Sequence, residues 1–183
     1  EQTGLSEQLS GLQNAQGDLD MAIAIRSELQ ELYNDELGPT HGDALLLIQE
    51  GLLAANNTNF GEAATFFDES SIAFDLAKDN ARVAVTKSKA LLELVPSSLH
   101  NTFDTSHRQS KSTILAMDSQ SREYKAAASL YIIMGEWNDV DNEGSSEEIE
   151  RWRGLAADAE DLLEEAMTKL DEADTWAPGL WRR

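Results

Sequence analysis

The sequence predicts an all-α fold, an elongated antiparallel bundle of about five helices. Apolar residues recur at intervals of three and four over long stretches, which is the helical period. No window shows the alternation of apolar and polar residues, bounded by hairpin turns, that is typical of strands. Short connections favour antiparallel neighbours. The 183 residues fit a single helical domain, 1–183, with tails at 1–4 and 176–183.

The first predicted helix covers residues 5–37. Gly11 and Gly17 weaken its start, because glycine is a poor helix former. Gly38 and Pro39 are expected to end it, since the residue before a proline is pushed out of the helical region. Its apolar positions are Leu5, Leu9, Leu12, Leu19, Ile23, Leu29, Leu32 and Tyr33.

Four further helices are predicted along the chain. Residues 44–55 are apolar almost all round, so this short helix is expected to be buried. Residues 56–59 form a turn, and a long heptad-like helix follows over 60–95 until Pro96 ends it. The next helix covers 105–137, with a serine-rich first half that is expected to fray. The last begins near Ser146 and continues to Ala173.

The charge is strongly acidic and is spread over the whole chain. Asp and Glu number 34 against 14 Lys and Arg, a net charge of −20. Such a surface repels nucleic acids and anionic membranes, and it favours cationic partners or metal ions. Self-repulsion destabilises the folded state unless salt screens it. The composition therefore suits a protein of a salt-loving organism, and an ordinary acidic helical protein is the alternative.

Four features of the sequence bear on the cellular location. The chain contains no cysteine, which excludes disulfides, zinc-thiolate sites and covalent haem attachment. No run approaches the roughly 18 apolar residues of a membrane span. The chain starts at Glu1, and we expect that a signal peptide or an anchor preceded it. Asn56 begins a glycosylation sequon, which fits an extracellular or cell-surface protein. The cytoplasm of a halophile is the alternative.

Residues 44–74 have small and aromatic residues at positions typical of a helical hairpin. Gly51 stands where the first helix needs a small residue, and residues 59–63 read as a turn into a second helix. The stretch resembles a tetratricopeptide repeat. This resemblance implies superhelical packing of helix pairs, whereas a plain antiparallel bundle is the alternative. A shift by the family's period of about 34 residues finds no second repeat directly after it.

The connection before the last helix is rich in carboxylates and resembles an EF-hand calcium loop. The resemblance implies that six residues supply oxygen ligands to Ca²⁺ and that Gly144 provides the sharp turn. The alternative is a solvated connection in which Ser145 and Glu148 form a capping box for the last helix. The implied ligands are Asp139, Asp141, Glu143, Ser145 (through its carbonyl), Glu147 and Glu150.

Histidines and aromatic residues supply the other candidate sites. His100, Asp104 and His107 could meet around a metal, and a polar loop is the alternative. His41 has no helical partner histidine, and the chain has no Glu-x-x-His, Gly-x-Ser-x-Gly or phosphate-loop motif. Four aromatic residues are candidates for a ligand groove or for core packing: Tyr124, Tyr131, Trp137 and Trp152.

The C-terminal tail combines aromatic and basic residues on an otherwise acidic chain. Trp176 and Trp181 flank Pro178, and Arg182 and Arg183 follow. We expect this tail to dock either on the chain's own bundle or on a neighbouring acidic subunit.

These patterns predict a non-enzymatic helical module for protein–protein interaction or assembly, exported or on the cell surface and adapted to high salt. It needs no cofactor, or Ca²⁺ alone. The alternative from another class is a ligand-binding helical-bundle domain of a sensor or receptor. A helical-bundle enzyme with a metal at His100 or His107 is a third hypothesis.

Overall fold

The structure is a computed structural model that describes residues 2–140 and 144–181. Every regular element in these ranges is a helix, so the predicted all-α class is confirmed. Within the same ranges no helix combines the length and apolar character that a membrane span needs. The elements are α1 (Gln2–Glu31), the π-helical turn η1 (Leu32–Leu37), α2 (Gly38–Asn56), α3 (Phe60–Leu94), the 3-10 turn η2 (Ser97–Leu99), α4 (His100–Asp139) and α5 (Ser146–Trp176).

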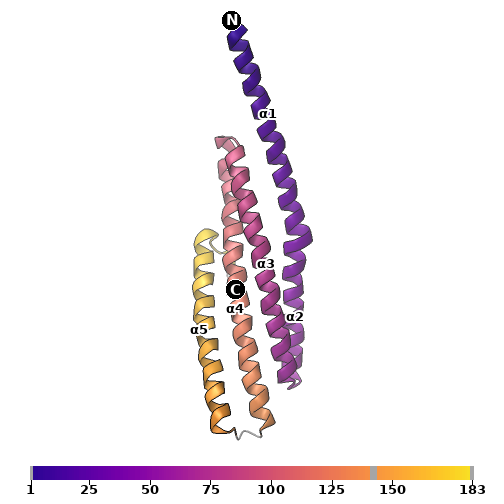
Figure 1. Cartoon of the computed structure of the whole chain (residues 1–183), viewed down its shortest axis with the longest axis vertical. Coiled ribbons are helices and arrows are strands. Elements are labelled where there is room, and N and C mark those ends of the chain that lie inside the picture. Colours follow the sequence, from indigo (N-terminus) through magenta and orange to yellow (C-terminus); the bar gives the residue numbers. More distant parts are fainter. Residues whose placement is uncertain (1, 141–143, 182–183) are drawn as a thin grey trace.

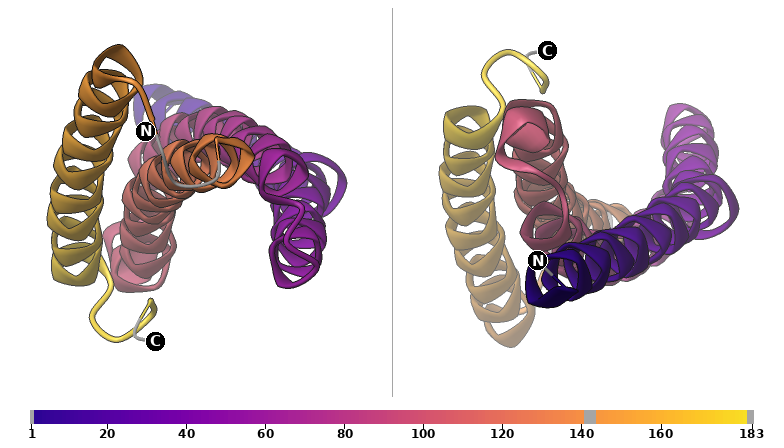
Figure 2. Two further views of the ribbon diagram at one scale, coloured as in Figure 1. Left: turned by 90° about the horizontal axis from the view of Figure 1, so that it is seen from below. Right: turned by 90° about the horizontal axis from the view of Figure 1, so that it is seen from above.

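The helices form an elongated, open row. α2 continues from α1 through η1, and α3, α4 and α5 run alongside (Figure 1). The main contacts are between α2 and α3, α3 and α4, and α4 and α5. Figure 2 shows the row end on as a curved layer, with α2 and α5 at its two edges. Each edge helix therefore has an outer face without a neighbouring helix.

The predicted break at Gly38 and Pro39 is wrong, because the chain stays helical from α1 through η1 into α2. The π turn shifts the hydrogen-bond register, so that the Gly38 N–H reaches the carbonyl of Tyr33, five residues back. Pro39, which has no N–H, falls in the first turn of α2 where none is required. The π turn leaves no room for a side chain at Gly38, because a Cβ there would lie 2.9 Å from the backbone carbonyl oxygen of Tyr33.

The prediction that the second helix is buried on all sides is also wrong. α2 packs on α3 through one face only, which carries Ala44, Ile48, Gly51 and Ala54. Leu45, Leu46, Leu52 and Leu53 face outward instead, with Leu46 60% exposed. Gly51 lies against Phe67 on α3, where an added Cβ would be 3.1 Å from the ring. The resemblance to a tetratricopeptide repeat stays a prediction.

α3 carries two buried heptad series on neighbouring faces. One series packs against α1 and α2: Ser70 donates to the carbonyl of Ala44 on α2, and Ala84 clusters with Leu29 on α1. The other packs against α4, and its Phe67 and Phe74 also contact α2. The first series is Ala63, Ser70, Ala77, Ala84 and Leu91, and the second is Phe67, Phe74, Ala81 and Ser88.

α4 and α5 pack through small residues. Ser112 Oγ donates to the carbonyl of Ala173 at 2.8 Å, and Ser119 Oγ donates to that of Ala166 at 2.7 Å. The two pairs are seven residues apart on each helix, in antiparallel register. The serine-rich first half of α4 is therefore not frayed, contrary to the prediction. Ser110, Ser112 and Ser119 are buried there, and their hydroxyls make hydrogen bonds within the helix seams.

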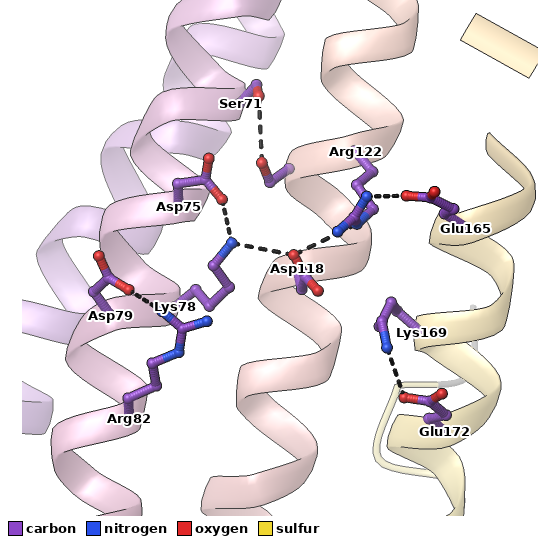
Figure 3. A network of polar contacts seen from close by, with 11 residues as sticks. Ser71, Asp75, Lys78, Asp79, Arg82, Asp118, Arg122, Glu165, Lys169 and Glu172 are labelled. Carbon is purple, nitrogen blue, oxygen red and sulfur yellow. Dashed lines mark hydrogen bonds and ion pairs between the residues drawn. The ribbon is translucent and has the colours of Figure 1, made fainter. Parts of the chain in front are cut away.

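A chain of ion pairs joins α3, α4 and α5 (Figure 3). Lys78 on α3 binds Asp75 at 2.6 Å and Asp118 on α4 at 3.1 Å. Arg122 lies 3.5 Å from Asp118 and also pairs with Glu165 on α5. Burial disfavours the charged form of Lys78, but its two carboxylate partners outweigh burial and raise its pKa. The chain of pairs fixes the register of three helices.

Candidate functional site

The first half of α1 extends beyond the turn between α3 and α4 and has no neighbouring helix there (Figure 1). Its leucines are exposed, Leu9 by 58% and Leu12 by 69%. Further along the helix Leu19 and Ile23 are also more than half exposed. Ala22 and Leu29, by contrast, are buried against α3 on another face. α1 therefore has two apolar faces, of which the chain itself covers one.

The exposed face of α1 leads into an apolar cleft of about 460 Å³. The cleft lies where the middle of α1 passes the end of α3 and the start of α4. Asp18 and Arg26 are the charged residues in its wall. The apolar wall consists of Ala15, Leu19, Ala22, Ile23, Leu91, Leu94, Val95, Pro96, Leu99 and Phe103.

The free part of α1 is also nearly uncharged. No Asp, Glu, Lys or Arg occurs over residues 8–17, although charged residues make up 26% of the chain. An exposed helix of an acidic protein would normally carry charge on its solvated face. This combination of exposure, apolar spacing and missing charge is typical of a surface that another protein covers.

A second exposed apolar face lies on α2, at the edge of the row. Its members are spaced for one side of the helix and are between 41% and 60% exposed: Leu45, Leu46, Leu52 and Leu53. The adjoining α3 also exposes Ile72 and Leu76.

The proposed calcium loop is only partly described. Asp139 is the last residue of α4, and Asp141 and Glu143 lie outside the described residues. Glu147 and Glu150 lie at the start of α5, where Glu150 pairs with Arg153 at 3.4 Å. In the described part of the chain no three His, Asp or Glu side chains come together as a metal site would require. Calcium binding by this loop stays a prediction.

Ser145 forms the capping box that was the alternative to a calcium site. Its hydroxyl accepts from the N–H of Glu148, and its own N–H donates to the Glu148 carboxylate at 2.8 Å. These two bonds form the capping box of α5. The backbone and hydroxyl of Ser145 stabilise the ionised form of Glu148 and lower its pKa.

Gly144 is required by packing on Trp152. A Cβ at Gly144 would lie 2.5 Å from two ring atoms of Trp152. That ring is held in place, because its Nε1 donates to Glu136 at 2.7 Å and it packs on Trp137. We therefore expect Gly144→Ala to lower the free energy of unfolding by about 1–3 kcal/mol, as measured by urea denaturation.

Gly154→Ala is the matched control for Gly144→Ala. Gly154 lies inside α5 with nothing within 4 Å of an added Cβ. Alanine there should stabilise the protein by about 0.5–1 kcal/mol, because it improves helix propensity. Equal effects of the two substitutions would contradict the packing argument.

The three histidines do not come together. His100 lies at the start of α4, where its Nε2 is 3.0 Å from the carbonyl oxygen of Val95. His107 lies further along α4, is buried, and its Nδ1 is 2.9 Å from Ser88 Oγ on α3. His41 lies in the first turn of α2 and packs on Phe74 of α3. The predicted polar loop at residues 100–107 is helical instead, because η2 lets α4 begin at His100.

His107 makes stability depend on pH. Burial and then the nearby charge of Lys111 lower its pKa below the ordinary value of 6.5. Below pH 6.5 the unfolded chain binds a proton that the folded chain resists, so stability falls as the pH falls. In 1 M salt, where screening limits the other charge effects, urea denaturation from pH 7.5 to about 5.5 should show this loss.

His107→Gln should flatten that pH dependence, because glutamine does not titrate in this range. His41, whose pKa burial also lowers, leaves a residual slope in the variant. His41→Gln is the matched comparison and should remove only the part of the slope that His41 contributes. A His107→Gln slope equal to that of the unsubstituted chain would show that His107 does not contribute.

The C-terminal tail lies on α4. Trp181 Nε1 donates to Ser112 Oγ at 2.8 Å, and Arg108 Nε donates to the carbonyl of Trp176 at 3.1 Å. Lys111 Nζ is 4.2 Å from the centre of the Trp176 ring, in cation–π geometry. Arg182 and Arg183 lie outside the described residues. Binding of the tail to a neighbouring subunit stays a prediction.

The four aromatic candidates lie in or beside the core. Tyr124 and Tyr131 stack with Phe67, at centroid distances of 6.0 and 5.1 Å, inside the α3–α4 seam. Trp152 is buried, and Trp137 is 41% exposed beside it. These aromatic residues pack in and around the core and do not line an open groove together. Asn56 is exposed at the end of α2, and its glycosylation stays a prediction.

The apolar cleft beside α1 could not be found from the sequence. Its walls come from segments about 70 residues apart. The exposed stripe did have a signal, the regular spacing of leucines in the stretch without charge. Comparisons with protein families, curated proteins and solved structures gave no match.

Proposed function

We propose that the chain is a non-enzymatic helical module for protein–protein interaction or assembly, exported or on the cell surface and adapted to high salt. The exposed apolar face on the free half of α1 carries this proposal, with Leu9 and Leu12 more than half exposed. Monomeric proteins rarely leave a long apolar helix face in water, because burying it is favourable. The net charge of −20 supports the high-salt part.

Light scattering tests the proposal. We expect the measured mass to rise above that of one chain, 20.1 kDa, as the concentration increases in about 2 M KCl, where screening removes repulsion between acidic chains. Adding calcium in a parallel series tests whether the acidic loop contributes. A mass of one chain at all concentrations, with and without calcium, would contradict the assembly role.

The cleft beside α1 favours a second function, ligand binding by a sensor or receptor domain. Its volume of about 460 Å³ and its apolar wall suit a small hydrophobic molecule. Thermal-shift measurements with small apolar metabolites test this function. A stabilising compound should lose its effect in Leu94→Gln, which places a polar group in the cleft wall. No shift with any compound would leave the cleft to a protein partner.

A further inference from the structure

The exposed residues of α1 form a heptad series that runs from the free half of the helix to the cleft. Leu9, Leu12, Gln16, Leu19 and Ile23 are separated by three, four, three and four residues. This is the spacing of the a and d positions of a coiled coil. The series is separate from the buried face of α1, which packs on α3. α1 can therefore pack on a further helix without giving up any contact within the chain.

From this series we propose that α1 binds α1 of a second copy of this chain, antiparallel, around a two-fold axis near Asn14. The proposal rests on the proposed assembly function and names its partner and geometry. Leu9 of each copy lies against Leu19 of the other, and Leu12 lies against Gln16. The free half of each α1 covers the apolar cleft of the other copy.

The extent of the free half supports this pairing. With Leu9 opposite Leu19, residues 2–13 of one copy lie alongside residues 15–26 of the other. Residues 15–26 are also the segment of α1 that lines the cleft. In the pair, the free half of α1 from one copy therefore covers the open apolar cleft of the other copy.

Charge decides between an antiparallel and a parallel pair. In a parallel pair Glu7, Asp18 and Asp20 would lie at the same level as their own copies. The antiparallel pair places these acids beside Met21, Ser10 and Gln8 instead. It also places the two acidic bodies at opposite ends of the pair, because each body lies beside the second half of α1 (Figure 1). For two chains of net charge −20, the antiparallel pair avoids the larger repulsion.

Charge also argues for a second copy as the partner. A cationic protein would bind the carboxylates that cover the rest of the chain, whereas residues 8–17 offer no charge to attract it. A second acidic copy can approach closely only through such an uncharged face.

The first test removes the seam. In sedimentation equilibrium in about 2 M KCl, where repulsion is screened, the combined Leu9→Gln and Leu12→Gln variant should associate at least about 100-fold more weakly. Both leucines are exposed, and glutamine keeps good helix propensity, so the fold and the helix content by circular dichroism should be unchanged. The matched control, Leu46→Gln with Leu53→Gln on α2, should associate like the unsubstituted chain.

The second test measures direction. Because the chain has no cysteine, Glu31→Cys gives one spin label per chain. Two labels in the antiparallel pair should lie roughly 50 Å apart, from a rise of 1.5 Å per residue over the distance from the axis. A parallel pair would bring them within about 25 Å, given helix axes about 10 Å apart.

The outcomes separate the two proposals. Loss of association in the α1 variant alone, together with the long label distance, supports the antiparallel pair. A short label distance overturns it. Loss of association only in the α2 variant also overturns it, while the assembly function stands. A strictly monomeric unsubstituted chain overturns both.

Discussion

Raising the KCl concentration from about 0.1 M to 1 M should increase the free energy of unfolding by roughly 5 kcal/mol. This value follows from Coulomb's law for a charge of −20 on the folded chain, as the Debye length shortens from about 10 Å to 3 Å. The unfolded chain spreads the same charge over a larger volume and gains less from screening. Urea denaturation at each salt concentration, followed by circular dichroism, measures the effect.

Ion pairs on the surface act in the opposite direction, but they are too weak to reverse the result. The pair between Arg82 and Asp79 is more than 60% exposed on both sides. Such exposed pairs contribute about 0–1 kcal/mol each, and salt removes only part of that. Repulsion among the excess carboxylates therefore dominates the salt response.

A variant with less charge provides the control for the salt experiment. Four exposed carboxylates of α5 can be neutralised together, which lowers the net charge from −20 to −16: Asp158→Asn, Glu160→Gln, Asp161→Asn and Glu164→Gln. The salt-induced gain should shrink by about one third, because the repulsion scales with the square of the charge. A chain that is equally stable in dilute buffer and molar salt would contradict adaptation to high salt.

Phe74→Ala should lower the free energy of unfolding by about 3–5 kcal/mol, as complete truncation of a buried phenylalanine typically does. Phe74 has no exposed surface. Its ring lies 5.6 Å from that of Tyr124 on α4 and 5.8 Å from that of His41 on α2. The cavity would therefore open where α2, α3 and α4 meet, and straight long helices can close it only by moving together.

Ile72→Ala on the same helix is the matched control for Phe74→Ala. Ile72 is 61% exposed, so its truncation should change stability by no more than about 0.5 kcal/mol. Urea denaturation of both variants in molar salt separates core packing from charge effects. A loss below about 1 kcal/mol for Phe74→Ala would be inconsistent with a tightly packed junction of three helices.

Local signals in the sequence predicted the two ends of α3 and the start of α5. The turn at residues 56–59 and the stop at Pro96 bound α3, and Ser145 with Glu148 marks the start of α5. These signals work because caps, prolines and glycines act on their own backbone. Gly38 and Pro39 did not end the helix as predicted. The π turn carries the helix through them, and that turn depends on the hydrogen-bond register of the preceding residues.

The candidate site was predictable only in part. The leucine spacing and the uncharged stretch of α1 are visible in the sequence, but the sequence does not show that Leu9 and Leu12 lack a neighbour while Leu29 has one. The leucines of α2 show the same difficulty, because an apolar helix is buried on all sides only if helices surround it.

The sequence by itself determined the helical class, the acidic surface and the heptad series, because periodicity and charge are properties of the chain alone. The tertiary structure decided that the helices form an open row, and so which of two apolar faces on α1 is covered. The physical reason is that burial depends on what lies across from a side chain. For Leu19 and Ile23 the facing wall comes from residues about 70 positions away.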